Sequence, residues 1–382
     1  MQVGLYVHVP FCARKCPYCD FYSLPLGERR LVDAYVAAVC QEMEAVAKSY
    51  TCLGRLEAPT LYLGGGTPSL LDLEDLQRLL EGARKFFHLL PDAEVTVECN
   101  PGSVDAAKAQ GLRRLGVNRV TLGVQSFDDQ LLRVLERAHT AADALQAMTH
   151  LRAAGFDNIG IDVIFGIPGE TLADWCNDLR RAVALRPQHL SAYGLTIEEG
   201  TPFAQWVREG RLQRVDDDLE ADMFEAAMAA FTAAGYEHYE ISNYALPGKR
   251  SRHNQIYWRN EPYLGFGPSA VSYIDGVRWG NIASLPRYLA AMEHGTPPIE
   301  WSERAPRPLQ MGETMMAGLR LLEGVEYARF RSRFGVTPAE AYPHVLQRLA
   351  ETGLLSVGPD RVALTHRGLL LANNVMAEFL PD

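Results

Sequence analysis

Residues 9–21 read Val-Pro-Phe-Cys12-Ala-Arg-Lys-Cys16-Pro-Tyr-Cys19-Asp-Phe, directly after the first apolar run of the chain. Three thiolates can hold three irons of a [4Fe–4S] cluster and leave the fourth iron open for chemistry, whereas four cysteines usually close such a site. Two alternatives stay open from these residues alone. A zinc ion would need a fourth ligand, for which His8 and Asp20 stand nearby, and three cysteines can also be ordinary buried thiols.

The composition indicates a protein that is reduced and cytoplasmic. The 382 residues carry a formal net charge of −10, which argues against non-specific binding to nucleic acid. The remaining cysteines, Cys40, Cys52, Cys99 and Cys176, show no disulfide-like spacing. The chain opens on a strand-like run without the features of a leader peptide, and no stretch is apolar enough to span a bilayer. Contact with a membrane surface is left open.

The first two-thirds of the chain alternate short apolar runs with longer amphipathic segments. The expected strands are Leu5–Val9, Thr60–Gly64, Glu94–Glu98, Arg119–Gln125, Asn158–Phe165 and His189–Ile197. The expected helices are Glu28–Ser49, Leu71–Phe87, Val104–Leu115, Thr140–Ala154 and Thr171–Leu185, with a further one over 217–235. This alternation predicts an α/β fold with a parallel sheet, as a partial (β/α)6 barrel or a flat doubly wound sheet. In both, sites form at the carboxyl ends of the strands.

The rest of the chain divides into three further parts. We expect a core over 1–235, a loop-rich extension over 236–295, a proline-rich linker over 296–308 and a C-terminal α+β module over 309–382. In the last part, helices over Leu309–Leu321, Thr337–Thr352 and Arg367–Phe379 flank a hairpin signal that ends at Leu364. This order of helix, hairpin and helix resembles a winged-helix module. Acidic and basic residues are mixed throughout the module, which favours a role in packing or partner docking over DNA binding.

Polar and glycine residues gather where the expected strands end. Gly64-Gly65-Gly66-Thr67-Pro68 follows the second strand, and glycines allow a backbone to approach a ligand closely with its amides free. Further candidates at or after strand ends are Glu98, Gln125, Arg137 and Asp162. Asp162 lies within an apolar strand, where an unpaired charge is costly, so we expect it to have a definite partner.

These motifs resemble those of known radical S-adenosylmethionine (SAM) proteins. The spacing C-x3-C-x2-C with an aromatic-rich loop is their signature, and Tyr18 fits the pattern. The runs that start at Tyr6, Gly64, Val97, Gly123 and Asp162 look like those of the oxygen-independent coproporphyrinogen oxidase family. The resemblance implies a radical-SAM barrel, with a [4Fe–4S] cluster on Cys12, Cys16 and Cys19. It also implies SAM contacts by Tyr6, Tyr18, Gly65, Gly66, Thr67, Glu98, Gln125, Arg137 and Asp162.

Two features distinguish the dehydrogenase branch of this family from its haem-chaperone (HemW-type) branch. The resemblance implies that the dehydrogenase has a fourth cysteine two positions after the third, where this chain has Phe21. It also implies an additional N-terminal segment in the dehydrogenase, which we expect this protein to lack. The motif His253-Asn-x-x-Tyr257-Trp258 resembles the haem-chaperone branch. Imidazole is a standard axial ligand of haem iron, aromatic faces pack on a macrocycle, and Arg250 and Arg252 suit propionates.

The interpretation is therefore a haem chaperone that binds haem and transfers it to an acceptor haem protein, expected to be membrane-associated. If the protein carries out radical chemistry, an electron donor is expected as a further partner. Nucleic acid is not expected as a partner. The residues identify no catalytic group. Two alternatives are a coproporphyrinogen III dehydrogenase and a radical SAM enzyme with a non-porphyrin substrate. His8, His189, His238 and His366 compete with His253 as haem ligands.

Overall fold

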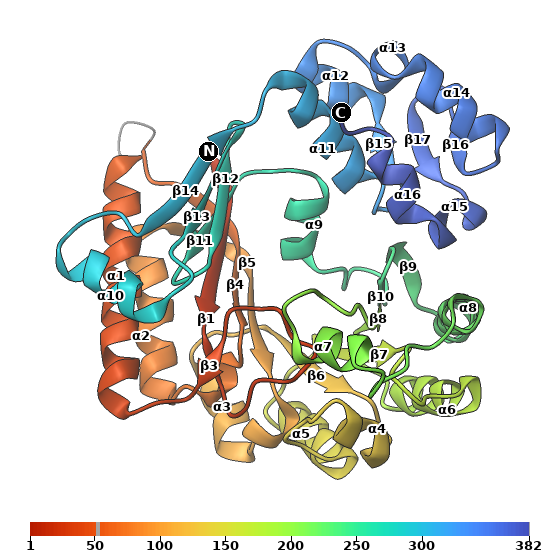
Figure 1. The fold of residues 1–382 in the computed structure, drawn as a ribbon. Coiled ribbons are helices and arrows are strands. Elements are labelled where there is room, and N and C mark those ends of the chain that lie inside the picture. Colours follow the sequence, from red (N-terminus) through yellow and green to blue (C-terminus); the bar gives the residue numbers. More distant parts are fainter. Residues whose placement is uncertain (51–53, 382) are drawn as a thin grey trace.

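The computed structural model describes residues 1–50 and 54–381, so Cys52 lies outside the described residues. Its main feature is a curved sheet in the order β14-β13-β12-β11-β1-β4-β5-β6-β7-β8-β10-β9 (Figure 1). Seven strands of this sheet run parallel to one another: β1 (Gln2–Val9), β4 (Glu57–Gly65), β5 (His88–Cys99), β6 (Arg119–Gln125), β7 (Ile159–Phe165), β8 (His189–Gly194) and β11 (Tyr263–Phe266). The predicted α/β fold with a parallel, barrel-like sheet is confirmed.

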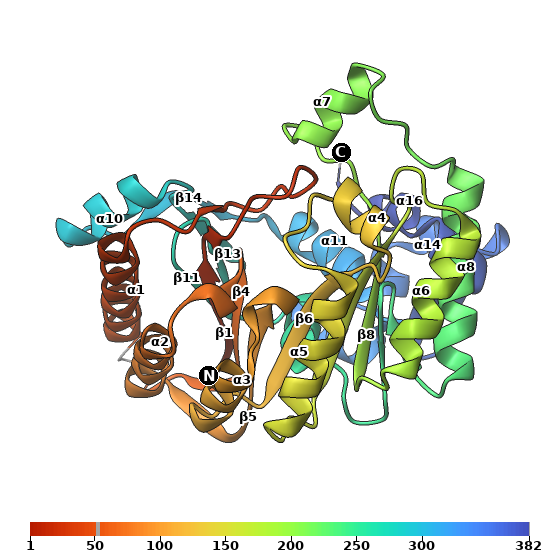
Figure 2. The same ribbon diagram turned by 90° about the horizontal axis from the view of Figure 1, so that it is seen from below.

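Helices follow the parallel strands along the chain, and the longer ones cover the convex face of the sheet (Figure 2). They are α1 (Arg29–Ser49), α2 (Leu73–Phe86), α3 (Ala106–Arg114), α4 (Asp129–Val134), α5 (Ala141–Ala153), α6 (Leu172–Ala184), α7 (Pro202–Arg208) and α8 (Asp217–Ala233). Short 3-10 turns, Pro68–Leu70 and Pro101–Ser103, follow β4 and β5. Capping boxes at Thr140 and Thr171 start α5 and α6 where the sequence expects them.

Alternate residues of the parallel strands face the helices and the hollow of the sheet. In β1, Val3, Leu5 and Val7 join the large apolar core beneath the helices. Gly4 faces the other way, because a Cβ there would lie 3.5 Å from the His253 ring. The next inward residue, Tyr6, stacks 6.4 Å from the same ring. One face of the sheet therefore builds the core, and the opposite face encloses a polar interior.

The extension after α8 is more regular than the sequence predicts. It contains β9 (Glu237–Glu240), β10 (Asn243–Ala245), α9 (Arg252–Trp258), β11 (Tyr263–Phe266), β12 (Val271–Ile274), β13 (Val277–Asn281) and α10 (Leu285–Glu293). Most of these strands are three to five residues long, too short for an alternating pattern to stand out. The expected linker also carries a strand, β14 (Ile299–Arg304), whose six residues are all exposed. Prolines flank this edge strand without interrupting it.

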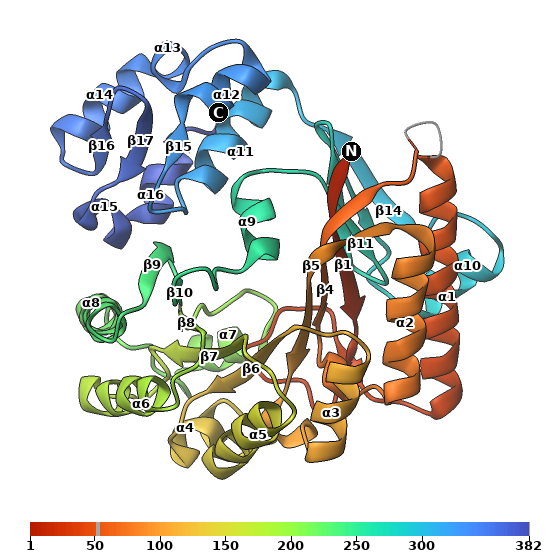
Figure 3. The same ribbon diagram turned by 180° about the vertical axis from the view of Figure 1, so that it is seen from behind.

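The C-terminal module has its own small sheet, in the order β15-β17-β16, and its own apolar core (Figure 3). Its elements are α11 (Arg307–Gly318), β15 (Val325–Glu326), α12 (Tyr327–Phe334), α13 (Pro338–Ala341), α14 (Pro343–Glu351), β16 (Leu355–Val357), β17 (Arg361–Leu364), α15 (His366–Leu370) and α16 (Ala372–Ala377). The single helix expected over Thr337–Thr352 is broken at Tyr342, because the residue before a proline avoids helical geometry. The helix expected over Arg367–Phe379 is likewise divided, at Leu371.

Backbone hydrogen bonds join this module to the sheet edge. The Ile241 amide donates to the Arg320 carbonyl (3.1 Å), and the Leu322 amide donates to the Tyr239 carbonyl (3.1 Å). Within the described parts of the chain, no helix is long and apolar enough to cross a membrane.

Candidate functional site

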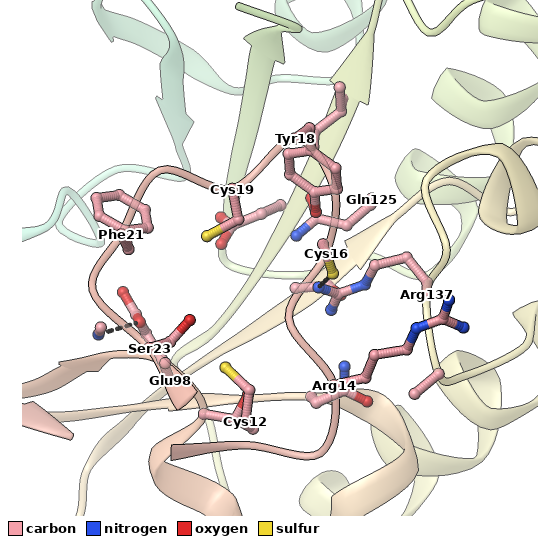
Figure 4. Close-up of a pocket in the computed structure, with 18 of the residues that line it drawn as sticks. Cys12, Arg14, Cys16, Tyr18, Cys19, Phe21, Ser23, Glu98, Gln125 and Arg137 are labelled. Carbon is pink, nitrogen blue, oxygen red and sulfur yellow. Dashed lines mark hydrogen bonds between the residues drawn. The ribbon is translucent and has the colours of Figure 1, made fainter. Parts of the chain in front are cut away.

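The three cysteines of the signature lie on one loop above the carboxyl ends of the parallel strands. The base of the loop is fixed where β2 (Phe11–Cys12) pairs with β3 (Leu24–Pro25). A turn within the loop joins the Cys19 amide to the Cys16 carbonyl (3.2 Å). Cys12, Cys16 and Cys19 all line one pocket of about 620 Å³, and Figure 4 shows them around a common space. The spacing in the sequence thus places three thiols at one cavity.

Two of these sulfurs have hydrogen-bond donors. The Arg137 Nη1 lies 3.5 Å from the Cys16 Sγ, and the Thr67 hydroxyl lies 3.7 Å from the Cys12 Sγ. Burial raises the pKa of the Cys19 thiol. Iron bound by the three sulfurs would favour their thiolate forms and offset that cost.

The glycine loop after β4 is packed against the cysteine loop. The Gly66 amide donates to the Val9 carbonyl (2.8 Å), and the Thr67 amide donates to the Phe11 carbonyl (2.7 Å). A Cβ on Gly66 would lie 2.7 Å from that Phe11 oxygen. The expectation of free amides is therefore wrong here, because both amides already donate to backbone carbonyls, of Val9 at the end of β1 and of Phe11 in β2. Gly65, Gly66 and Thr67 nevertheless line the pocket.

Gly65 depends on its lack of a side chain for a different reason. Its φ is +103°, and a Cβ would lie 2.6 Å from the His8 ring. Its amide donates to the Glu98 Oε2 (3.1 Å). The glycine loop thus holds two parts of the site in place: the cysteine loop and the Glu98 carboxylate.

Glu98 and Asp162 place two half-buried carboxyl groups at the pocket. Burial raises the pKa of Glu98 to about 7, although the Tyr62 hydroxyl donates to it at 2.6 Å. Burial also raises the pKa of Asp162 to about 6, against an opposing hydrogen bond from Ser191. The partner expected for Asp162 is present, but its Oδ1 is buried without any protein partner. That oxygen is suited to a donor group of a ligand.

Gln125 and Arg137 complete the polar lining. The backbone φ angle of Gln125 is 67°, a value uncommon for residues other than glycine. Gln125 lies at a β-bulge, where the register of the pairing between β6 and β7 shifts. The Arg137 Nη2 donates to the Gly123 carbonyl (3.0 Å), while its buried Nε has no protein partner. Tyr18 also lines the pocket, and burial raises the pKa of its hydroxyl.

Tyr6 is the one expected SAM contact that does not line this pocket. Its hydroxyl instead pairs with the His8 Nδ1 (3.0 Å), in the hollow of the sheet. Direct contact between Tyr6 and SAM stays a prediction that this position does not favour. Sequence reasoning missed Thr121 and Tyr193, which line the pocket from β6 and β8. Thr121 lies two residues before Gly123 in β6, and Tyr193 lies two residues after Ser191 in β8. Because side chains two residues apart in a strand share a face, this spacing is the signal that could have identified them.

The residues present fit a [4Fe–4S] cluster and SAM. Three thiols border one cavity, and beside them lie an unpartnered carboxylate oxygen on Asp162 and an unpartnered guanidinium Nε on Arg137. Such groups suit a ligand with amino, carboxylate and hydroxyl functions. Among the described residues, no three His, Cys, Asp or Glu side chains are gathered closely enough to hold a single metal ion.

The residues of the His-Asn-x-x-Tyr-Trp motif lie elsewhere, on helix α9. The His253 side chain is 1% exposed, and burial lowers its pKa to about 3. Its Nδ1 pairs with the Thr60 hydroxyl (2.8 Å) and its Nε2 with the Tyr257 hydroxyl (2.9 Å). Both ring nitrogens are thus engaged within the protein, a fact that the sequence does not reveal.

Three of the other residues proposed to contact haem have different partners in the structure. Arg250 pairs with Glu237 (3.1 Å) and Glu323 (3.3 Å), and the Arg252 Nη1 pairs with Asp92 (3.2 Å). The Trp258 ring lies 4.3 Å from the Arg320 guanidinium. Each of these three side chains therefore already has a partner within the protein. Among the competing histidines, His8 and His189 also have a ring nitrogen bonded to a tyrosine hydroxyl, of Tyr6 (3.0 Å) and Tyr239 (2.8 Å).

The fold and the cysteine loop define a class, that of radical SAM proteins. The radical SAM superfamily model matches residues 6–182, and the HemN C-terminal domain model matches residues 306–371. Membership of this superfamily implies a [4Fe–4S] cluster and SAM. A solved structure of coproporphyrinogen III oxidase (HemN) from Escherichia coli superposes with a TM-score of 0.85, covering 99% of this chain and 90% of that chain. At 23% sequence identity, this likeness shows the fold alone.

Relatives along nearly the whole chain then define the family. The haem chaperone HemW of Bacillus subtilis is 37% identical over 379 residues, which are 99% of each chain. HemW of Escherichia coli is 36% identical, covering 100% of this chain and 98% of that protein. The chain belongs to the HemW haem-chaperone family.

Proposed function

We propose that this protein binds haem and transfers it to an acceptor haem protein. The observation that carries the proposal is the end-to-end similarity to proteins named haem chaperones, which extends through the barrel, the extension and the C-terminal module. If the similarity were confined to the barrel, it would support membership of the radical SAM superfamily but not a function in haem transfer. The coproporphyrinogen dehydrogenase and the non-porphyrin radical SAM enzyme are not favoured by these relatives.

In this proposal, Cys12, Cys16 and Cys19 hold three irons of the cluster. The support is their common cavity and the donors that Thr67 and Arg137 direct at two of the sulfurs. When bound and reduced, the cluster and SAM supply one-electron chemistry at an open iron. The chain's own residues orient the ligands. The residues proposed to contact SAM at the same pocket are Tyr18, Gly65, Gly66, Thr67, Glu98, Gln125, Arg137 and Asp162.

The residue at position 21, Phe21, supports haem transfer rather than oxidation of coproporphyrinogen as the function of this protein. It stands where the resemblance implies a fourth cysteine in the dehydrogenase branch, and it lines the same pocket with 61% of its surface exposed. A phenyl ring offers neither a ligand to iron nor a proton to a reacting group. The chain therefore lacks at this position the chemistry that the dehydrogenase pattern supplies.

The haem site is proposed to involve His253, with Tyr257, Trp258, Arg250 and Arg252. Two observations support His253 as the axial ligand of haem iron. It belongs to the motif, and its lowered pKa keeps the imidazole neutral, whereas a protonated ring could not bind iron. The internal bonds of His253 require a local rearrangement before it can act as a ligand. A cytoplasmic location, a membrane-associated acceptor and an electron donor remain parts of the proposal.

A haem titration tests this function. The protein with its cluster reconstituted anaerobically is titrated with haem, and binding is followed by the Soret band. Saturation with one haem per chain, followed by transfer to an apo-haem acceptor, is expected. A parallel anaerobic assay supplies SAM, reductant and coproporphyrinogen III. Vinyl-group formation at a robust rate would overturn the chaperone assignment, and failure to bind haem would favour a non-porphyrin substrate.

A further inference from the structure

Helix α9, which carries the His-Asn-x-x-Tyr-Trp motif, is fixed inside the hollow of the sheet (Figure 1). The Glu94 carboxylate of β5 accepts from the Arg252 amide (3.2 Å) and from the His253 amide (3.1 Å). Those amides have no partner within the helix, so a buried carboxylate at this point anchors its first turn. The Ser251 hydroxyl completes the cap at the Asn254 amide (3.2 Å). The helix is thus fastened to the parallel strands.

The bonds of His253 define a closed arrangement. An axial ligand must offer iron a ring nitrogen with a free lone pair. Thr60 engages the Nδ1 and Tyr257 engages the Nε2, so iron can bind only after one of these bonds is broken. The Tyr257 hydroxyl lies on the same helix, one turn away, and its displacement would free the Nε2. An open arrangement therefore differs from the closed one by at least this hydrogen bond.

Tyr62 contacts both the buried histidine and the cofactor pocket. Its ring is stacked on the His253 ring, with centroids 5.0 Å apart and planes inclined by 21°. Its hydroxyl donates to the Glu98 Oε1 at 2.6 Å, and Glu98 lines the pocket that the cysteines border. One rigid aromatic side chain therefore spans the distance between the two proposed sites.

We propose that Tyr62 is a positioning residue through which SAM in the pocket holds His253 closed to haem. This inference rests on the proposed function. A cationic ligand favours the ionised form of Glu98, and a hydrogen bond to a carboxylate is stronger than one to a carboxylic acid. The Tyr62 ring is then held more firmly against His253. Because binding free energies are reciprocal, SAM and haem weaken each other's binding by the same factor.

The test is a thermodynamic cycle on the full chain with an oxidised cluster, so that SAM is bound and not cleaved. The Kd of haem is measured with and without saturating SAM, and the Kd of SAM with and without haem. We expect both ratios to be equal, at about 5-fold weakening. The Tyr62→Phe variant keeps the stacked ring and loses the bond to Glu98, so its ratio should fall to about one.

A matched control removes the same kind of bond elsewhere. The Tyr288 hydroxyl donates to the buried Glu42 carboxylate at 2.7 Å, outside the residues that line the cofactor pocket. Tyr288→Phe should therefore keep the full ratio. A second variant, Tyr257→Phe, frees the His253 Nε2 and should tighten haem binding about 5-fold without SAM.

The outcomes separate the inference from the function on which it rests. No haem binding by the unmodified chain would overturn the proposed function, and this inference with it. Haem binding that SAM leaves unchanged or strengthens would overturn the inference alone. A coupling that survives Tyr62→Phe would also overturn it, since the coupling would then travel by another route.

Discussion

SAM affinity should fall as pH falls through neutrality, because Glu98 must lose a proton to face a cation. Burial raises the pKa of this carboxyl to about 7 in the free protein. Below that pH most molecules hold the neutral acid, and ligand binding must release its proton. The sign follows from linkage: when the bound state holds fewer protons than the free state, affinity increases with pH up to the free-state pKa and then levels off.

The magnitude follows from the ionised fraction of Glu98. With a pKa of about 7, roughly 9% of the carboxyl is ionised at about pH 6 and roughly 76% at about pH 7.5. If only the carboxylate form binds, the affinity changes about 8-fold across this interval. Asp162, whose pKa is raised to about 6, steepens the change at the acidic end.

Isothermal titration of SAM into the cluster-loaded protein at these two pH values measures the effect. In Glu98→Gln the side chain cannot ionise, so SAM should bind more weakly and most of the pH dependence should vanish. Glu42→Gln is the matched control, since burial also raises the pKa of Glu42 to about 7, outside the lining of this pocket. An unchanged pH profile in Glu98→Gln, or a flat profile in the unmodified chain, would refute the assignment of Glu98.

Replacing Cys12, Cys16 or Cys19 singly with Ala should abolish the iron-dependent visible absorbance of the reconstituted protein; an intact cluster in any variant would exclude that cysteine as a ligand. Gly66→Ala should lower the free energy of unfolding by about 1–3 kcal/mol in urea titrations, because its Cβ would lie 2.7 Å from the Phe11 carbonyl oxygen. Unaltered stability would show that the loops separate easily. His253→Ala should weaken haem binding or shift the Soret band, while Ala at the exposed His344 should not. Identical spectra would assign the axial ligand to another side chain.

The parallel part of the fold could be predicted because its signal is local. The strands β1, β4, β5, β6, β7 and β8 each have at least six residues, enough for a strand pattern to be visible, and amphipathic helices follow them. The strands that follow α8 gave no such signal. β10 is Asn243–Ala245, three residues that are all buried, and β14 is Ile299–Arg304, six residues that are all exposed. Their pairing depends on neighbours distant in sequence, which one-dimensional patterns do not identify.

The pocket that the three cysteines border could likewise be anticipated from strand ends, since parallel strands bring their carboxyl ends to one edge. That rule correctly gathered Glu98, Gln125 and Asp162, but it could not show which amides were already occupied. The Thr67 amide donates to the Phe11 carbonyl, a contact that depends on how the cysteine loop folds back. His253 was harder still. A basic run in an expected loop suggests a solvated surface, whereas its ring is buried among residues of β1 and β4.

The burial of His253 follows from the alternation that builds the core. In β4, Leu61 and Leu63 face the helices, so Thr60 and Tyr62 must face the hollow of the sheet. Polar groups there need partners from within the protein, because water is largely excluded. Helix α9 supplies them through His253, and the pocket supplies Glu98. The residues that satisfy the polar interior are therefore the same ones that connect the motif with the cofactor pocket. A substitution that disturbs one site, such as Tyr62→Phe, should be detectable at the other even where the fold is unchanged.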